Sequence, residues 1–233
     1  MLPDLPPTFA ATRESLRAVA CYAISPARKA RTGRIGLRSY GDGIATPPFD
    51  DGTRYAVRGQ ELVCEPDRAT PITTVAAAAR FLGIEASRDP GVGHDLPPYA
   101  PDDDLAVDAA ASQVLGQWYA YGQRVIDRLA ASLPAGASAV EAQLWPEHFD
   151  LGTTVTMPGP GPDINVGFSP GDGFHGEPYA YVGPRDLTGL TGPFWNAPFG
   201  AYLPYGALAA GADPEAVALA FVMEGLDLAA GGG

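Results

Sequence analysis

Two short segments bring together the residue types that acid–base or metal chemistry requires. They read WPEHFD (145–150) and FHGEPYAY (174–181). If both are strands, the alternation of side chains puts His148 and Asp150 on one face of the first, and His175 and Glu177 on one face of the second. We therefore predict these four as the catalytic residues.

Three interpretations of this set stay open. If the two strands are neighbours, opposed side chains lie about 4.5–5.5 Å apart at Cβ, so that two imidazoles and two or three carboxylates could hold Zn²⁺, Mn²⁺ or Fe²⁺. Without a metal, a histidine beside a carboxylate can serve as an acid–base pair. The residues can also be purely structural, because SPGDG (169–173) is good turn chemistry in its own right.

A small-molecule pocket between sheet and helices would need further polar and aromatic side chains beside these four. The reaction expected there is hydrolysis, isomerisation or another proton transfer by a carboxylate–histidine pair. The predicted ligand-binding residues are Trp145, Glu147, Asn165, Asp172, Tyr179, Tyr181 and Trp195.

Short strands separated by turn residues must position these side chains. Turn residues at this spacing favour antiparallel pairing, since parallel strands need long crossovers. The predicted strands are 34–40, 44–49, 53–58, 60–64, 139–147, 149–156, 164–169 and 178–183.

Helices are predicted between the two groups of strands and at both ends of the chain. The first begins at Thr12 and is stopped or kinked by Pro26, and the others cover 73–82, 108–132 and a last helix opened by Asp213-Pro214-Glu215. In the long helix 108–132, Gly122 would let another element approach closely. This pattern predicts an α+β fold, a twisted antiparallel sheet packed against about four helices.

The chain is expected to form one domain over residues 1–233. Residues 1–11 read as a flexible lead-in, residues 88–104 as a proline- and aspartate-rich surface loop, and residues 229–233 as a frayed tail. The 29 glycines and 24 prolines among 233 residues fit a globular chain with long loops.

Charge and composition limit which partners and which location the sequence predicts. The formal net charge is −12, which disfavours nucleic acid, and no apolar run is long enough to cross a membrane. Cys21 and Cys64 lack the spacing of a metal knuckle or a disulfide framework, and the N-terminus lacks a signal peptide's apolar region, so a cytoplasmic protein is expected. The sequence predicts no oligomeric state.

An alternative class is a non-catalytic interaction protein. Residues 1–40 carry seven basic and two acidic side chains, whereas the rest of the chain carries 8 basic and 25 acidic ones. The basic segment 28–38 would then contact an anionic partner, and the aromatic segment 193–205 would form an interface.

Several strings lie along most of the chain. In the back half these are QLWPEHFDL (143–151), NVGFSPGD (165–172), EPYAYVG (177–183) and LPY (203–205), and in the front half TGRIGL (32–37) and PITT (71–74). Together they resemble a family of uncharacterised actinobacterial proteins. The resemblance implies a single continuous unit in the bacterial cytosol. It assigns no catalytic residue.

Overall fold

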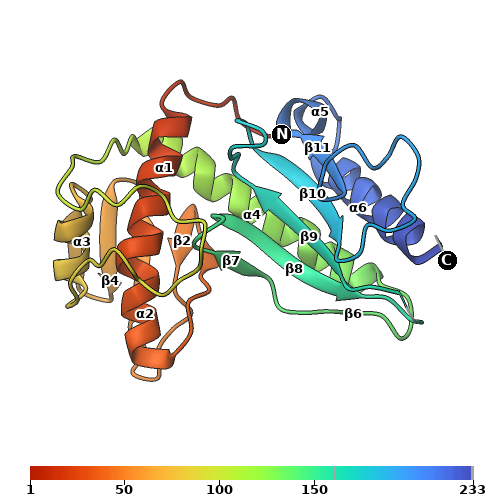
Figure 1. The fold of residues 1–233 in the computed structure, drawn as a ribbon. Helices are drawn as coiled ribbons and strands as arrows, with labels where there is room; N and C mark the ends of the chain where they lie inside the picture. The colour runs from red at the N-terminus through yellow and green to blue at the C-terminus, as the bar shows by residue number, and fades with distance from the viewer. Residues whose placement is uncertain (160, 232–233) are drawn as a thin grey trace. The chain divides into compact units, whose positions relative to one another are not determined.

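The structure is a computed structural model, which describes residues 1–159 and 161–231 (Figure 1). The α+β class is confirmed, with two antiparallel sheets where one was expected. The chain divides into two compact units: unit 1 comprises Met1–Pro3, Tyr121–Ala142 and Leu151–Gly233, and unit 2 comprises Asp4–Ala120 and Gln143–Asp150. The boundary falls within helix α4 (Ala109–Ser132), and the single domain predicted over 1–233 stays a prediction.

Unit 2 holds a five-stranded antiparallel sheet in chain order. Its strands are β1 (Arg38–Tyr40), β2 (Gly43–Ala45), β3 (Arg54–Arg58), β4 (Glu61–Glu65) and β5 (Arg68–Pro71). Strand β5 was not predicted from the sequence, and β1 and β2 are shorter than predicted. A further short strand, β7 (Gln143–Trp145), is tied to the chain before β1 by a bridge between Leu37 and Leu144.

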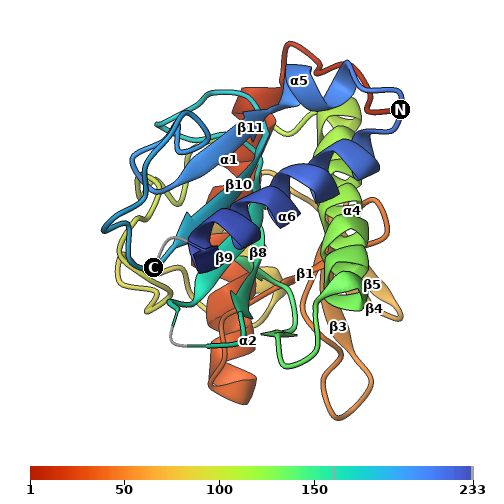
Figure 2. The ribbon, with the colours of Figure 1, turned by 90° about the vertical axis from the view of Figure 1, so that its right-hand side faces the viewer.

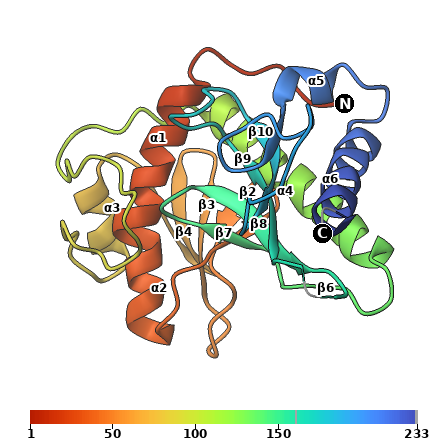
Figure 3. The same cartoon turned by 45° about the vertical axis from the view of Figure 1, so that its right-hand side comes forward.

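The N-terminal helix of unit 2 runs past Pro26, so of the two predicted outcomes, a stop or a kink, the stop is wrong. It consists of α1 (Phe9–Val19), the π-helical turn η1 (Ala20–Ile24) and α2 (Ser25–Thr32), which follow one line in Figure 3. The π turn ends at Ile24 and α2 begins at Ser25, so Pro26 lies in the first turn of α2, where a missing N–H is tolerated. The helix also begins at Phe9, inside the predicted lead-in.

The core of unit 2 joins this helix to α3 (Val75–Phe81) and to the loop 88–104, which contains no helix or strand, as predicted. Ala18, Cys21 and Tyr22 are buried against Val75 of α3 and Val92 of the loop. The loop is thus held as a packed part of the unit.

Unit 1 is a second antiparallel sheet covered by helices on one face. Its strands follow the order β11 (Ala201–Pro204), β10 (Tyr179–Pro184), β9 (Ile164–Ser169), β8 (Asp150–Thr156) and β6 (Ser138–Ala139). Buried side chains of the sheet meet Leu129 of α4 and Val222 and Leu226 of α6 (Pro214–Gly231), and Figure 2 shows both helices lying over the same side of the strands.

Three outcomes in unit 1 bear on the predictions. Strand 164–169 is confirmed to the residue, whereas β11 and the short helix α5 (Tyr205–Ala209) were not predicted. A Cβ on Gly122 would lie 2.7 Å from the Phe168 side chain, which confirms the predicted close approach of another element, here β9, to the helix at Gly122. Helix α6 continues to Gly231, so residues 229–231 of the predicted frayed tail are helical, its fraying stays a prediction, and residues 232–233 lie outside the described residues.

One backbone contact of unit 2 yields a test of its packing. A Cβ on Gly116 of α4 would lie 2.0 Å from the carbonyl oxygen of Asp42. Glycine to alanine in a helix ordinarily stabilises by about 1 kcal/mol. Here we expect Gly116→Ala to lower the free energy of unfolding by about 1–3 kcal/mol, since backbone cannot move aside cheaply. Chemical denaturation would measure the change.

Gly206→Ala is the matched control, because a Cβ at Gly206 in α5 meets nothing within 4 Å. It should leave stability unchanged or raised. Equal stability of the two variants would contradict the close approach of α4 to the Asp42 backbone.

Candidate functional site

The predicted site residues fall in two different units. Trp145, Glu147, His148 and Asp150 belong to unit 2, and the remaining seven belong to unit 1. Those of unit 1 are Asn165, Asp172, His175, Glu177, Tyr179, Tyr181 and Trp195.

The expected strand pairing between the four predicted catalytic residues does not occur. Strand β9 pairs with both β8 and β10, so β8 and β10 are not neighbours in the sheet. His148 lies in the turn before β8, and His175 and Glu177 precede β10, so these three are not strand residues. Within residues 1–159 and 161–231, no group of three or more His, Cys, Asp or Glu side chains could hold a metal ion.

In unit 2, the turn 146–149 has an unusual backbone that is fixed by two hydrogen bonds. Phe149 has φ +55°, a value that a non-glycine residue seldom adopts. Its N–H donates to the carbonyl of Trp145 at 2.7 Å, and its carbonyl accepts from the Tyr119 hydroxyl at 2.5 Å. A strained residue that is held in this way is a common feature of functional sites.

Arg17 of α1 attaches this turn to the helix and to the loop 88–104. Its Nε donates to the carbonyl of Glu147 at 2.8 Å, and its Nη2 donates to the carbonyl of Asp95 at 2.7 Å. Arg17 also lies 3.3 Å from the Asp95 carboxylate and 3.6 Å from that of Glu14. The guanidinium of Arg17 thus forms ion pairs with Glu14 and Asp95 beside the turn.

Glu147 has the carboxyl group best suited to proton transfer in this region. Its Oε2 is buried and accepts no hydrogen bond from any described residue, and the side chain packs on Gly93, where a Cβ would come within 2.8 Å. Burial raises the pKa of Glu147, although its own backbone N–H, His148 and Arg17 partly offset the effect and Asp150 adds to it. A desolvated carboxyl keeps its proton to higher pH and can act as an acid.

The neighbouring side chains of the turn differ from Glu147 in exposure. The His148 side chain is 62% exposed, and its Nδ1 lies 4.0 Å from the Asp95 carboxylate. Asp150 is buried, and Trp145 is partly exposed at the surface. The turn therefore presents an accessible imidazole next to Glu147, a half-buried acid with one buried carboxyl oxygen.

In unit 1, Asp172 organises the loop before β10. Its Oδ1 accepts from the backbone N–H groups of Phe174 and His175 at 2.8 and 3.1 Å, and its Oδ2 accepts from the Tyr179 hydroxyl at 2.6 Å. The Nε2 of His175 is buried and has no partner within the described part of the chain. Both carboxylate oxygens of Asp172 thus accept hydrogen bonds within the loop and β10.

Aromatic rings surround this loop. Phe174 lies 5.0 Å from Phe199 and 5.1 Å from Tyr202 between ring centroids, and Tyr179 and Tyr181 join the same group. We call Phe174, His175, Tyr179, Tyr181, Phe199 and Tyr202 the aromatic cluster. Because its rings fill the space between them, the cluster is a packed surface with Phe174 exposed.

The remaining predicted residues of unit 1 lie outside the aromatic cluster. Trp195 packs against the hydrophobic core that includes α6, and the centroids of the Trp195 and Phe194 rings lie 4.9 Å apart. Asn165 is exposed on β9, where Thr154 donates to its Oδ1 at 2.9 Å, and Glu177 is exposed.

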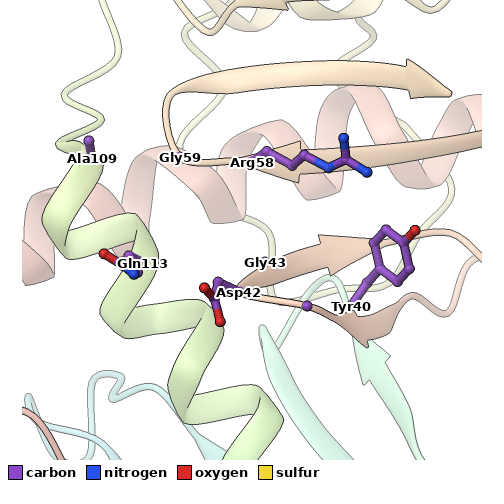
Figure 4. Close-up of a pocket in the computed structure, with 8 residues that line it drawn as sticks. Tyr40, Asp42, Gly43, Arg58, Gly59, Ala109 and Gln113 are labelled. Atoms are coloured by element: carbon purple, nitrogen blue, oxygen red, sulfur yellow. The ribbon is translucent and has the colours of Figure 1, made fainter. Parts of the chain in front are cut away.

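Sequence reasoning missed a cavity of about 670 Å³ in unit 2 (Figure 4). It lies between the β1–β2 turn, the β3–β4 turn and the first turns of α4. The signal in the sequence was the acid between two glycines at 41–43, a pattern that fits many loops. The lining residues are Tyr40, Gly41, Asp42, Gly43, Arg58, Gly59, Ala109 and Gln113.

Much of the basic segment 28–38 is engaged inside unit 2. Arg31 lies 3.7 Å over the Phe49 ring and 2.7 Å from the Asp51 carboxylate, and Lys29 donates to the carbonyl of Gly91. Arg28 is buried. These contacts leave less of the positive charge for an external partner.

Comparison with protein-family models, with curated proteins and with solved structures gives no match to this chain. No described helix is both long and apolar enough to span a bilayer. Any functional conclusion therefore depends on the geometry of the sites.

Cys21 of η1 yields a prediction about the turn 146–149. Its thiol donates to the carbonyl of Pro146 at 3.0 Å, and burial raises the pKa of Cys21 to about 12. At pH 8 the thiolate fraction would be roughly one in ten thousand, so iodoacetamide should leave Cys21 unmodified in the native protein. Peptide mass spectrometry would measure the modification.

The same reagent should modify Cys21 after unfolding in guanidinium. A Cys64→Ser variant keeps the second cysteine from complicating the result, because Cys64 is only half-buried. Rapid alkylation of native Cys21 would mean that the turn does not cover η1 as described.

Proposed function

We propose that the protein is a cytoplasmic small-molecule enzyme that performs acid–base catalysis at the turn 146–149 of unit 2. In this proposal Glu147 is the general acid and His148 the general base. The reaction class is hydrolysis or isomerisation of a neutral substrate, because both need one group to give a proton and another to take one.

The observation that carries the proposal is the buried Oε2 of Glu147, which has no hydrogen-bond partner among the described residues. Buried polar atoms in folded proteins nearly always have a partner. A substrate oxygen that accepts the Glu147 proton would provide one.

The other residues of the turn would position these two groups. Arg17 holds the backbone of Glu147, and the Asp95 carboxylate lies 4.0 Å from His148 Nδ1. In this scheme the imidazole of His148 accepts a proton from water or substrate. Arg17 and Asp95 are positioning residues in this scheme.

The raised pKa of Glu147 predicts how stability changes with pH. Between the ordinary value for glutamic acid, about 4.3, and the raised value, the folded state binds more protons than the unfolded state. The free energy of unfolding should therefore fall as pH rises through that window. Glu147→Gln should remove this decrease, since glutamine cannot ionise.

Urea denaturation at several pH values, with Glu85→Gln as the exposed control in unit 2, would test this dependence. The Glu85 variant should keep the slope of the wild type. If Glu147→Gln kept that slope too, Glu147 would not be a desolvated acid.

Catalysis can be tested without a known substrate. Small carbonyl compounds in D₂O report proton transfer through the loss of their α-C–H signals in NMR, and p-nitrophenyl esters report hydrolysis. In the assay in which the wild type is active, Glu147→Gln and His148→Gln should each reduce the rate by about 10²-fold or more, while Glu85→Gln retains it. Wild-type rates equal to buffer in both assays, or rates unchanged in both variants, would contradict the proposal.

The contacts of the structure give less support to the interaction-protein alternative. Phe194 stacks on Phe221 of α6, and Trp195 packs on the core, so part of the aromatic segment 193–205 is used inside unit 1. A salt-sensitive assembly in gel filtration would revive that alternative.

A further inference from the structure

The cavity of Figure 4 is separate from the turn 146–149 and has walls that are fixed by backbone contacts. Gly43 and Gly116 have no room for a side chain, because a Cβ would lie 2.1 Å from the carbonyl oxygen of Val57 and 2.0 Å from that of Asp42, respectively. Gln60 Nε2 donates to the carbonyl of Val107 at 2.6 Å, which ties the β3–β4 turn to the start of α4. A site built on such walls needs little reorganisation to bind a ligand.

Opposite charges occupy the two sides of this cavity. Figure 4 shows Asp42 and Gln113 on one side, and Arg58 and Tyr40 on the other. Asp42 and Gln113 are exposed, and the Arg58 side chain is 58% exposed, so all three are accessible to a small molecule.

The Arg58 side retains hydrogen-bonding capacity although it is already paired. Its Nη2 contacts the Glu65 carboxylate, which also accepts the Tyr40 hydroxyl at 3.3 Å. A guanidinium has five N–H donors, so one contact leaves donors for a ligand carboxylate. Arg54 lies 4.1 Å from the centre of the Tyr40 ring and holds it in place.

We propose that this cavity binds a zwitterionic small molecule, an α-amino acid or a short peptide. Its ammonium group would contact Asp42 and the Gln113 side-chain oxygen, its carboxylate would contact Arg58, and its apolar part would lie against Tyr40. A purely anionic ligand would meet Asp42 and a purely cationic one Arg58, whereas a zwitterion matches both sides. The volume lies within the range of ligand pockets, roughly 300–1,000 Å³.

Calorimetry and saturation-transfer NMR on the full chain would test the proposal with L-phenylalanine and the dipeptide Gly-Phe. At least one should bind, and N-acetylation or C-terminal amidation of that compound should each weaken binding by about tenfold or more. This comparison uses the wild-type protein alone, so it holds even if a variant fails to fold.

Asp42→Asn and Arg58→Gln should each weaken binding of the active compound by a similar factor. Asp67→Asn and Arg185→Gln are the controls, because both residues are exposed and lie outside the cavity. Binding that survives either blocking group, binding unaffected by both cavity variants, or no binding of either zwitterion would overturn the proposal. None of these readouts depends on Glu147, so this proposal and the proposed enzymatic function can fail separately.

Discussion

The candidate site depends on the hydrogen bonds that the guanidinium of Arg17 donates to two backbone carbonyls. This guanidinium joins α1, the loop at Asp95 and the turn at Glu147, three parts of unit 2 that are far apart in the chain. A planar guanidinium with donors in fixed directions can satisfy two backbone carbonyls at once, which a lysine cannot do with the same geometry. The bond from Arg17 to the Glu147 carbonyl adds to those that Cys21 and Tyr119 make with the carbonyls of Pro146 and Phe149 in the same turn.

The same helix also orders a loop that has no regular structure of its own. Tyr22 donates to the carbonyl of Pro97 and lies 5.2 Å from the Tyr99 ring between centroids, and Lys29 holds Gly91. These contacts fix the proline-rich loop against η1 and α2. Of the two acids paired with Arg17, Asp95 lies on this loop, whereas Glu14 lies on α1.

Local sequence patterns predicted the elements that local physics controls. Helical periodicity indicated the long helix α4, and the alternation of apolar residues indicated β8, β9 and β10. The missed strand β11 is four residues long and ends in a proline, so its identity as a strand comes from pairing with β10. Pro26 does not stop the helix, because the chain passes through the π turn η1 and places Pro26 in the first turn of α2.

The sequence by itself determined the α+β class and drew attention to Glu147 and His148, because residue type and spacing are local properties. Only the tertiary structure decided that His148 and His175 belong to different units, and that Glu147 meets an arginine 130 residues earlier in the chain. The cavity at Asp42 likewise exists only because two hairpin turns meet the start of α4. Contacts between distant segments depend on which surfaces pack together, and no local pattern encodes that choice.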